Sequence, residues 1–479
     1  MKSCSKILRA TFCLLALFIL PGMSDAAGPE QGSSSFQQSL DRFHKAAGRV
    51  GVMLVSLPSG QPTFEYRSKE GFVPASVVKL LTSYAALKKL GPSFRFGTEI
   101  YARGEPTGGV VQGDIWIRGS GDPFFVAAKA QVLAQALKDR GIRQITGGIF
   151  TDNGFFDPAS EHICLDADCI GTYNPVVSAT AVDFNLAPVR LGVPQKPGKP
   201  VTVETTWAGN YARVSGKAVS AKKKGALKVR PLGATGDGRE EFQISGQAPT
   251  RGPRTREYRF HAADPAGLFA HTVRAALERS GVRVQGQATR EGTVPPGAVM
   301  IARYESPPLS ELVAGLNKHS NNFMAEMLLK GLAGHVTGPP GTTSKGVSVV
   351  RAALKEAGAP DQTGMIDCGS GLSRYCLVSP ETFCRLLAAA WRDTAMGAEF
   401  LASLAANAEA GTLKRRMRKP GLTVRGKTGT LNDVIGFAGY VSGPSGRTFA
   451  VAIILNDVRD RSRARQAIDS FLDEVAFSN

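Results

Sequence analysis

Cysteine and histidine are scarce in this chain, which limits the metal chemistry that it can support. Only 7 cysteines and 6 histidines occur among 479 residues. No Cys-x-x-Cys pair or cysteine–histidine cluster has the spacing of a zinc site, and the histidines are scattered along the sequence. We therefore expect no metal ion and no other cofactor.

Long apolar runs are also missing beyond the N-terminus. There, basic residues precede a mostly apolar run over 10–20 and a small-residue site that ends at Ala26, an arrangement typical of a secretory signal. This run and the longest later one, 449–455, are shorter than the roughly 20 residues that a membrane-spanning helix needs. The sequence predicts a signal peptide at 1–26 and a soluble, exported protein of the periplasm or cell envelope.

The few cysteines after the signal bear on the redox state of the mature chain. They are Cys164, Cys169, Cys368, Cys376 and Cys384. In an oxidising compartment the close pairs 164/169 and 368/376 are candidates for disulfides, although spacing does not establish connectivity. The odd number leaves at least one thiol free. Cys384 lies in a stretch with helical periodicity and is predicted to be a small buried apolar residue.

Acidic residues are outnumbered, and the formal net charge is +18 at pH 7. The basic residues of the segment 214–260 are Lys217, Lys222, Lys223, Lys224, Lys228, Arg230, Arg239, Arg251, Arg254, Arg256 and Arg259. Such a cluster attracts polyanions. Because a signal peptide argues against nucleic acid, we expect no nucleic-acid partner and consider anionic envelope polymers or a membrane surface. A solvated basic face without a partner explains the charge at least as well.

Hydrophobic periodicity divides the chain into three parts. Two strands around a Pro-Ser-Gly turn are predicted at 50–66, followed by an apolar helix that begins near Ser76. From 98 to 290, short alternating strands are broken by many glycines and prolines. Helical periodicity then returns, and the chain closes with strands and a terminal helix. The two ends are expected to form one α/β module that the β-rich region interrupts.

These boundaries give a domain prediction. The chain exceeds the roughly 250–300 residues that one hydrophobic core organises, so two or more domains are expected. After the signal peptide, residues 27–97 and 291–479 are assigned to the α/β domain. Residues 98–290 are assigned to the inserted β-rich region, with two subdomains, the second near 185–255.

A serine and a lysine stand one turn apart at the start of the first apolar helix. At positions i and i+3 the Lys79 amine can approach the Ser76 hydroxyl. A serine needs a neighbouring base to become a nucleophile, and a desolvated lysine can act as that base because burial lowers its pKa. From the spacing alone, an N-cap serine and a lysine that reaches solvent would be the simpler interpretation.

Two further motifs change that interpretation. Ser320-x-Asn322 and the run Lys-Thr-Gly-Thr at 427–430 each occur once in the chain. Taken singly, Ser320 could cap a helix and Lys427 could flank a glycine turn. Three motifs in the order Ser-x-x-Lys, Ser-x-Asn and Lys-Thr-Gly are instead typical of the penicillin-recognising serine enzymes.

On these motifs the chain resembles the class C low-molecular-mass penicillin-binding proteins, the D-alanyl-D-alanine carboxypeptidase/endopeptidases of the penicillin-binding protein 4 type. The resemblance covers essentially the whole mature chain, and the interval from Ser76 to Ser320 is far longer than simple serine β-lactamases allow. It implies a serine β-lactamase/transpeptidase-like α/β (α+β) module with a β-rich multi-domain insertion between the first and second motifs. It also implies peptidoglycan stem peptides as substrates and β-lactam antibiotics as inhibitors.

Secondary matches agree with this resemblance. The segments GSGDPFF, GTLKRRM and CGSGLSRYCLVSP are similar to the family's Gly-Asp-Pro, Gly-Thr-Leu-x-x-Arg and Gly-Ser-Gly-Leu-Ser-Arg segments. The last of these implies substrate contacts by Ser370, Ser373 and Arg374. One departure occurs at Cys368, where the family usually has aspartate, whereas here Asp367 lies one residue earlier.

The mechanism that the resemblance implies is acyl transfer in two steps. Ser76 attacks the carbonyl of a D-alanyl peptide bond, with Lys79 as the proton acceptor. Ser320 relays a proton toward the leaving amine, and Asn322 holds the substrate backbone. Water then releases the acyl group, whereas the acyl-enzyme formed with a β-lactam hydrolyses slowly.

The third motif supplies charge and hydrogen-bond donors under the same resemblance. Its expected substrate-binding residues are Thr428, Gly429 and Thr430. Lys427 adds a positive charge that is expected to lower the pKa of Lys79 further, and with the two threonines it suits a terminal carboxylate. The backbone N–H groups of Ser76 and Thr430 are the expected oxyanion hole.

Two other functions remain as alternatives. A serine β-lactamase uses the same motifs but must deacylate quickly, and the long insertion argues against it. A non-catalytic wall-binding protein on the same fold would be expected to lose Ser76, Lys79 or Lys427, and all three are present. The predicted function is a serine DD-peptidase of peptidoglycan metabolism that trims terminal D-alanine, cuts D-alanyl cross-links, or does both.

Overall fold

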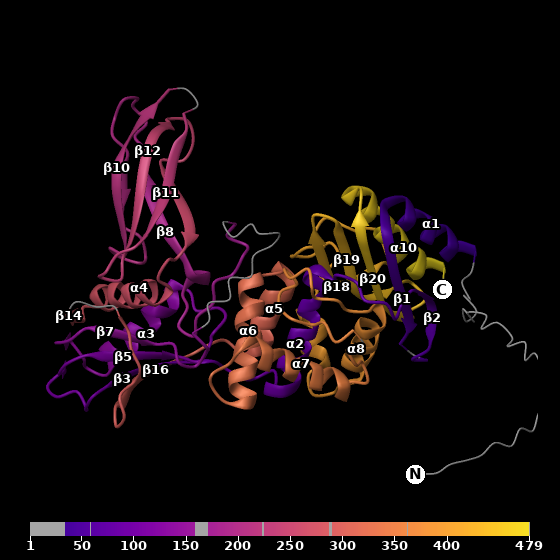
Figure 1. Cartoon of the computed structure of the whole chain (residues 1–479), viewed down its shortest axis with the longest axis horizontal. Helices are drawn as coiled ribbons and strands as arrows, with labels where there is room; N and C mark the ends of the chain where they lie inside the picture. The colour runs from indigo at the N-terminus through magenta and orange to yellow at the C-terminus, as the bar shows by residue number, and fades with distance from the viewer. Residues whose placement is uncertain are drawn as a thin grey trace, which may run out of the picture.

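The computed structural model describes residues 34–57, 59–158, 171–222, 225–286, 290–361 and 363–478. The predicted signal peptide and the Cys164/Cys169 pair lie outside these ranges. Within them the two ends of the chain form one α/β domain, and the middle of the chain forms an insert beside it, drawn on the left of Figure 1.

A six-stranded antiparallel sheet is the centre of the α/β domain, with the strand order β17–β18–β19–β20–β1–β2. Its strands are β1 (Ala47–Ser56), β2 (Pro62–Tyr66), β17 (Ala405–Ala406), β18 (Thr423–Leu431), β19 (Val434–Ser442) and β20 (Thr448–Val458). The pairing of Val52 with Ile453 is part of the long β1–β20 ladder. The predicted strands at 50–66 therefore complete a sheet whose other strands come from the C-terminal end.

Helices cover both faces of this sheet, which is why its strands are apolar on both sides. Along β1, Val52 and Leu54 join one core together with residues of α1 (Ser34–Ala46) and α10 (Arg461–Ser478). The alternate residues of β1 face the opposite core, against α8 (Pro380–Arg392). The predicted terminal helix is α10.

A layer of helices beyond α8 carries the first two motifs. Its members are α2 (Lys79–Leu90), α5 (Leu309–His319), α6 (Asn322–Thr337), α7 (Thr343–Glu356) and α9 (Gly397–Ser403). α2 is the central helix of this layer, because residues 79–87 are all buried and the helix contacts each of the other four as well as α8. The apolar helix predicted after Ser76 is thus enclosed on every side.

The insert is built on a five-stranded sheet with the order β15–β7–β5–β3–β16. The strands are β3 (Gly97–Ala102), β5 (Ile115–Gly119), β7 (Ile149–Asp152), β15 (Arg290–Glu291) and β16 (Val299–Glu305). Three short strands, β4 (Val110–Val111), β6 (Gln144–Ile145) and β14 (Arg283–Val284), form a second sheet. Two helices, α3 (Ala127–Asp139) and α4 (Pro265–Arg279), pack against each other and on the larger sheet.

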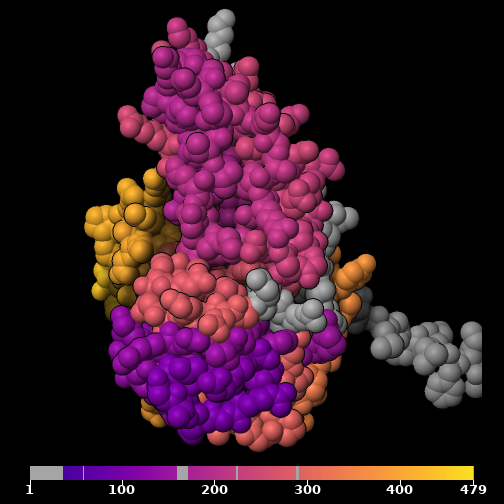
Figure 2. All heavy atoms as spheres, turned by 90° about the vertical axis from the view of Figure 1, so that its left-hand side faces the viewer, coloured from indigo at the N-terminus to yellow at the C-terminus, as the bar shows by residue number. Residues whose placement is uncertain are grey.

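Two three-stranded sheets project from the insert as a lobe, which stands upright in Figures 1 and 2. One has the order β13–β8–β9 and the other β10–β12–β11. Their bounds are β8 (Leu186–Gly192), β9 (Thr202–Glu204), β10 (Ala212–Ala221), β11 (Leu227–Ala234), β12 (Glu240–Pro249) and β13 (Thr255–His261). Phe242 of β12 and Leu268 of α4 belong to the same buried cluster, so the lobe shares a core with the layer below it.

The insert differs from the sequence prediction in two respects. It contains α3 and α4 as well as strands. In addition, β16 pairs with β3, so the sheet of the insert extends to Glu305, whereas the α/β domain was predicted to resume at residue 291. We propose a boundary after Glu305, directly before α5.

Candidate active site

The first motif lies in a tight turn that leads into α2. Ala75–Val78 form one 3₁₀ turn, in which Ala75, Val77 and Val78 are buried and Ser76 is half-buried. Ala75 has a positive φ of 48°, a conformation that is unfavourable for residues with a side chain and is often found at functional sites. Three apolar side chains thus anchor the turn and leave the Ser76 hydroxyl accessible.

Lys79, the first residue of α2, is fully buried and has three hydrogen-bond partners from different parts of the chain. Its Nζ lies 2.9 Å from the Ser76 Oγ, 2.8 Å from the Asn322 Oδ1 and 2.5 Å from the backbone oxygen of Ser370. Of these partners, the Asn322 oxygen and the Ser370 carbonyl can only accept. A neutral amine has two N–H groups and one lone pair. If these two acceptors take the N–H groups, the lone pair points at the Ser76 hydroxyl.

Burial moves Lys79 toward that neutral form. Desolvation lowers the pKa of Lys79 from 10.5 to about 7, and the buried Glu326 carboxylate acts in the opposite direction. Burial is therefore the main cause of the lowered pKa of Lys79. Burial first, and repulsion by the charge of Lys79 second, hold the pKa of Lys427 well below its usual value. Because repulsion between two cations is mutual, a further lowering of the Lys79 pKa by Lys427 stays a prediction.

The second motif sits at a break between two helices. The sequence shows helical periodicity over 309–334, but the structure has two helices there: α5 ends at His319 and α6 begins at Asn322. Ser320 closes α5 in a left-handed conformation with φ 56°, and the Asn321 side chain caps α6 by accepting from the Met324 N–H at 3.0 Å. This break turns the Ser320 hydroxyl and the Asn322 amide toward the other motifs.

Asn322 also links the α/β domain to the insert. While its Oδ1 accepts from Lys79, its Nδ2 donates to the backbone oxygen of Tyr173 at 2.9 Å. Tyr173 belongs to the insert segment that approaches the active site. In this conformation the chain itself engages one of the two amide N–H groups of Asn322, the residue expected to hold the substrate backbone.

The third motif lies on β18, against the turn that bears Ser76. Lys427 is fully buried, and its Nζ donates to the Ser320 Oγ at 2.7 Å and to the Thr428 backbone oxygen at 2.8 Å. The second and third motifs are thus joined directly through a hydroxyl and an amine. Because Lys79 contacts Asn322 and Lys427 contacts Ser320, hydrogen bonds join the second motif to both of the others.

Glycine is required at the centre of the third motif. A Cβ on Gly429 would lie 2.7 Å from the Pro74 backbone oxygen and 3.1 Å from the Ala75 Cβ, so only glycine lets β18 approach the turn this closely. The neighbouring Thr428 is half-buried and Thr430 is exposed. The two threonines, two positions apart on one strand, lie on the same face of β18.

The loop at 370–374 differs from the sequence expectation in its first residue. Ser370 is fully buried, and its contribution to the site in this structure is the backbone oxygen that contacts Lys79. Ser373 donates to the Asp367 carboxylate at 2.5 Å, and Arg374 pairs with Asp433 beyond β18 at 2.5 Å. A substrate contact by the Ser370 side chain is therefore not supported, whereas Ser373 and Arg374 remain at the half-exposed rim of the loop.

Sequence reasoning missed Glu326, which holds this loop in place. Glu326 lies on α6 and is 3% exposed. Its two carboxylate oxygens accept the backbone N–H of Gly369 at 3.1 Å and that of Ser370 at 2.7 Å. Burial raises the pKa of Glu326, and these hydrogen bonds and Lys79 oppose the rise. Its position one helical turn after Asn322 was the available signal, because residues i and i+4 share a helix face.

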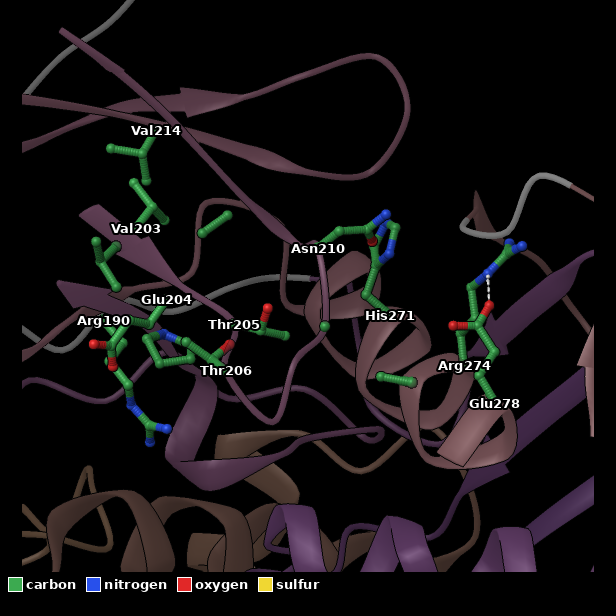
Figure 3. Close-up of a pocket in the computed structure, with 15 residues that line it drawn as sticks. Arg190, Val203, Glu204, Thr205, Thr206, Asn210, Val214, His271, Arg274 and Glu278 are labelled. Atoms are coloured by element: carbon green, nitrogen blue, oxygen red, sulfur yellow. Dashed lines mark hydrogen bonds and ion pairs between the residues drawn. The ribbon is translucent and has the colours of Figure 1, made fainter. Parts of the chain in front are cut away.

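A separate cavity of about 370 Å³ lies in the insert between α4 and the strands of the lobe (Figure 3). His271 and Asn210 both line it, and Arg274 and Glu278 form an ion pair at 2.9 Å on α4. Burial lowers the pKa of His271 to about 4, so this imidazole is neutral at pH 7. The lining includes none of the residues of the three motifs, and we assign this cavity no part in their chemistry.

Comparisons with known proteins agree with the three motifs. The model of the family described as D-Ala-D-Ala carboxypeptidase 3 (S13) matches residues 37–475. The D-alanyl-D-alanine carboxypeptidase of Actinomadura sp. (strain R39) is 32% identical over 474 residues, with 93% of this chain and 86% of that protein covered. The D-alanyl-D-alanine carboxypeptidase DacB of Haemophilus influenzae is 24% identical over 468 residues, with 95% and 94% covered.

Solved structures share the fold. Penicillin-binding protein 4 from Haemophilus influenzae superposes with a TM-score of 0.76 at 22% identity, covering 91% of this chain and 99% of that chain. A predatory peptidoglycan endopeptidase from Bdellovibrio bacteriovorus superposes with a TM-score of 0.52 at 17% identity, covering 90% and 94%. These similarities confirm the predicted fold class.

Removing the Glu326 carboxylate is expected to destabilise the domain. In Glu326→Ala the N–H groups of Gly369 and Ser370 lose their acceptors inside the core, which should lower the free energy of unfolding by about 2–4 kcal/mol. Urea unfolding followed by fluorescence measures the change. The matched control is Glu311→Ala, because Glu311 is exposed on α5. Equal stability of the two variants would contradict the assignment of Glu326 as the residue that holds the loop.

Proposed function

Because the chain belongs to the D-Ala-D-Ala carboxypeptidase 3 (S13) family, we propose that it is a serine DD-peptidase that forms an acyl-enzyme at Ser76. The substrate is the D-alanyl peptide bond of peptidoglycan stem peptides, either at the terminal D-Ala-D-Ala or in a cross-link. The observation that carries the proposal is the set of contacts around Lys79, whose buried amine is held against the Ser76 hydroxyl by two acceptors.

The first step follows from these contacts. Neutral Lys79 takes the proton of Ser76 as the hydroxyl oxygen attacks the peptide carbonyl. The charge that develops on the carbonyl oxygen requires donors, and the backbone N–H groups of Ser76 and Thr430 are the proposed pair. The ammonium formed at Lys79 is stabilised by all three of its hydrogen-bond partners and by the nearby Glu326 carboxylate.

The leaving amine needs a proton, and Ser320 is the proposed relay. Its Oγ accepts from Lys427, so its own proton is free to point toward Asn322 and the substrate. Lys427, Thr428 and Thr430 together suit the terminal carboxylate of a D-Ala-D-Ala peptide. Asn322 would hold the substrate backbone after exchanging its contact with the Tyr173 carbonyl for one with the substrate.

The same chemistry accounts for inhibition by β-lactams. Ser76 opens the β-lactam ring and remains acylated, because the product stays tethered in the place that hydrolytic water would need. A β-lactamase differs only in the speed of the second step, so turnover of a chromogenic cephalosporin separates the two functions.

We also propose that the protein acts in the cell envelope after export. The expected signal at 1–26 carries this proposal. Among the described helices, none combines the length and apolar character needed to cross a bilayer.

The lobe of the insert presents a basic surface to solvent. On the sheet β10–β12–β11, Lys217 and Lys228 flank Ser245 in one row, and Arg230 lies beside Gln243 in the next. All five side chains are exposed. We propose that this basic face binds anionic envelope polymers. The residues between the cations are polar rather than apolar, which favours a hydrated polyanion over insertion into a membrane.

The nucleophile assignment is tested with a fluorescent penicillin. Ser76→Ala should abolish covalent labelling of the purified protein, because it removes the hydroxyl that is hydrogen-bonded to Lys79. Ser348→Ala, at an exposed serine of α7, should label like the wild type. Labelling of Ser76→Ala at the wild-type level would refute the proposed nucleophile.

The pH dependence of acylation tests the role of Lys79. Because the base must be neutral and its pKa is lowered to about 7, the second-order rate constant for acylation should rise with pH and level off above about pH 8. Circular dichroism over the same range serves as the control for unfolding. A rate that still climbs steeply at about pH 10 would show that Lys79 keeps its usual pKa.

The basic face is tested by charge reversal. The triple variant Lys217→Glu, Lys228→Glu, Arg230→Glu should lose most of its binding to purified anionic envelope polymer at low salt, and penicillin labelling should not change. The wild-type affinity should fall steeply as salt increases. Equal binding by the triple variant, or wild-type binding to anionic vesicles but not to polymer, would overturn the proposal.

A further inference from the structure

Two buried cysteines flank the loop that contacts Lys79. Cys368 is 2% exposed and Cys376 is 0% exposed, and both belong to the core of the α/β domain. The structure contains both as free thiols. Their sulfur atoms and a carboxylate oxygen of Asp367 all lie within 4.8 Å of one another.

The two cysteines stand at the base of the loop. Met365 and Leu377 form an antiparallel bridge just outside the pair, and Phe72 bridges to Val378 next to it. These bridges bring the two ends of the loop together, whatever the state of the sulfur atoms. The N–H of Gly371 donates to the Cys368 Sγ at 3.3 Å, so the sulfur is in contact with the loop backbone.

The loop between the cysteines is packed on the nucleophile turn. Gly371 has a φ of 83°, and a Cβ on it would lie 2.0 Å from the Ala75 backbone oxygen. Only a glycine fits there. Immediately before it, the Ser370 carbonyl accepts from Lys79. A small displacement of this loop would therefore move one of the two acceptors that orient the Lys79 lone pair.

We propose that Cys368 and Cys376 are joined by a disulfide in the exported protein, and that this bond fixes the loop whose Ser370 carbonyl positions Lys79. The bond lies beneath the loop rather than at its surface. Cys368 and Cys376 are in this sense positioning residues that act through Ser370.

The bond forms by exchange with an oxidising disulfide, either a thiol–disulfide oxidoreductase or a small disulfide such as oxidised glutathione. One cysteine thiolate attacks the oxidant, giving a mixed disulfide and releasing one thiol. The second cysteine thiolate then attacks the mixed disulfide, closing the bond and releasing the other thiol. Two electrons pass from the two cysteines to the oxidant, and the two cysteine protons end on the released thiols.

The folded protein would make this exchange slow, so the bond is expected to form during folding. The contact with Cys376, and then burial, raise the pKa of the Cys368 thiol well above its usual value, and a thiol rather than a thiolate is a poor nucleophile. Once formed, the buried bond is protected from reductants in the same way. Cys384 is not a competing partner, because its buried Sγ lies 3.3 Å from the Met53 backbone oxygen, in the core against β1.

The alternative for the same atoms is a metal ion held by Asp367 and the two thiolates. Asp367 is exposed, and its carboxylate already accepts from Ser373. Three ligands with one at the surface make a poor closed site, and structural zinc sites normally have four. The geometry therefore favours the disulfide, and the metal becomes an outcome of the test.

The direct test is a peptide map of the full-length protein isolated from the cell envelope. The protein is denatured in alkylating reagent without reductant and digested with trypsin, which cleaves after Arg374, between the two cysteines. The expected product is peptide 356–374 linked to peptide 375–385, lighter than the two free peptides by two hydrogen atoms, with Cys384 alkylated. Cys376→Ser should abolish the linked species, and Cys384→Ser should retain it.

Two results of this map would overturn the proposal. Alkylation of both Cys368 and Cys376 in the unreduced wild type would show that the thiols are free. Alkylation only after chelation, together with stoichiometric zinc in the purified protein, would show that a metal holds them. Neither result depends on the proposed function.

The positioning role is tested by kinetics, and this part rests on the proposed acylation of Ser76. The variant Cys368→Ala/Cys376→Ala should acylate with penicillin about 3- to 30-fold more slowly than wild type, because a displaced acceptor misorients the base. The rise of the acylation rate with pH should also shift to higher pH, because water that reaches Lys79 would raise its pKa toward the usual value. Cys384→Ala is the control at a third buried thiol. Wild-type rate and pH profile in the double variant would overturn the positioning role even if the disulfide is found.

Discussion

The active site depends on one energetically unfavourable feature, the complete burial of a lysine amine in the first turn of a core helix. Burial removes the Lys79 amine from water, which disfavours its charged form and lowers its pKa from 10.5 to about 7. The core around α2 must be large and well packed to hold it. The enclosure of α2 by five other helices, and the large sheet behind α8, are what make this burial stable.

A buried amine can act as a base toward Ser76 only if its lone pair has a fixed direction. This requirement explains the positions of the elements that contact Lys79. α6 supplies Asn322, the 369–371 loop supplies a carbonyl, and Glu326 holds that loop from the same helix as Asn322. The same helix, α6, therefore positions both acceptors of Lys79: Asn322 directly, and the Ser370 carbonyl through Glu326. The break at Ser320 and the glycines at 371 and 429 serve the same end, since each permits an approach that a regular helix or a side chain would prevent.

The sequence was sufficient for the motifs and for the α/β domain, because both have strong local patterns. The two strand-like segments around the Pro-Ser-Gly turn at 50–66 predicted β1 and β2, and the order of the three motifs predicted which residues would meet. Asp264 and Pro265 are a good start signal for α4, yet surrounding glycines and short strands hid both helices of the insert. The boundary at Glu305 depends on the pairing of β16 with β3, and pairing between distant strands leaves no local trace in one sequence. Glu326 was missed, and Ser370 was assigned to the substrate rather than to Lys79, because both contacts involve backbone atoms of the loop.

The insert is part of the site rather than an independent attachment. Along the chain, the insert follows α2, which bears Lys79, and ends before α5, whose C-terminal end bears Ser320. Its hydrogen bond to a motif residue is made by the Tyr173 carbonyl, which accepts from the Asn322 amide nitrogen, whereas the amide oxygen accepts from Lys79. The side-chain amide of Asn322 is therefore hydrogen-bonded to the insert through its nitrogen and to the Lys79 amine through its oxygen. A substrate group that replaces the Tyr173 carbonyl at Asn322 breaks this contact between the insert and the α/β domain, so the hydrogen bond couples the insert to the residue that contacts Lys79.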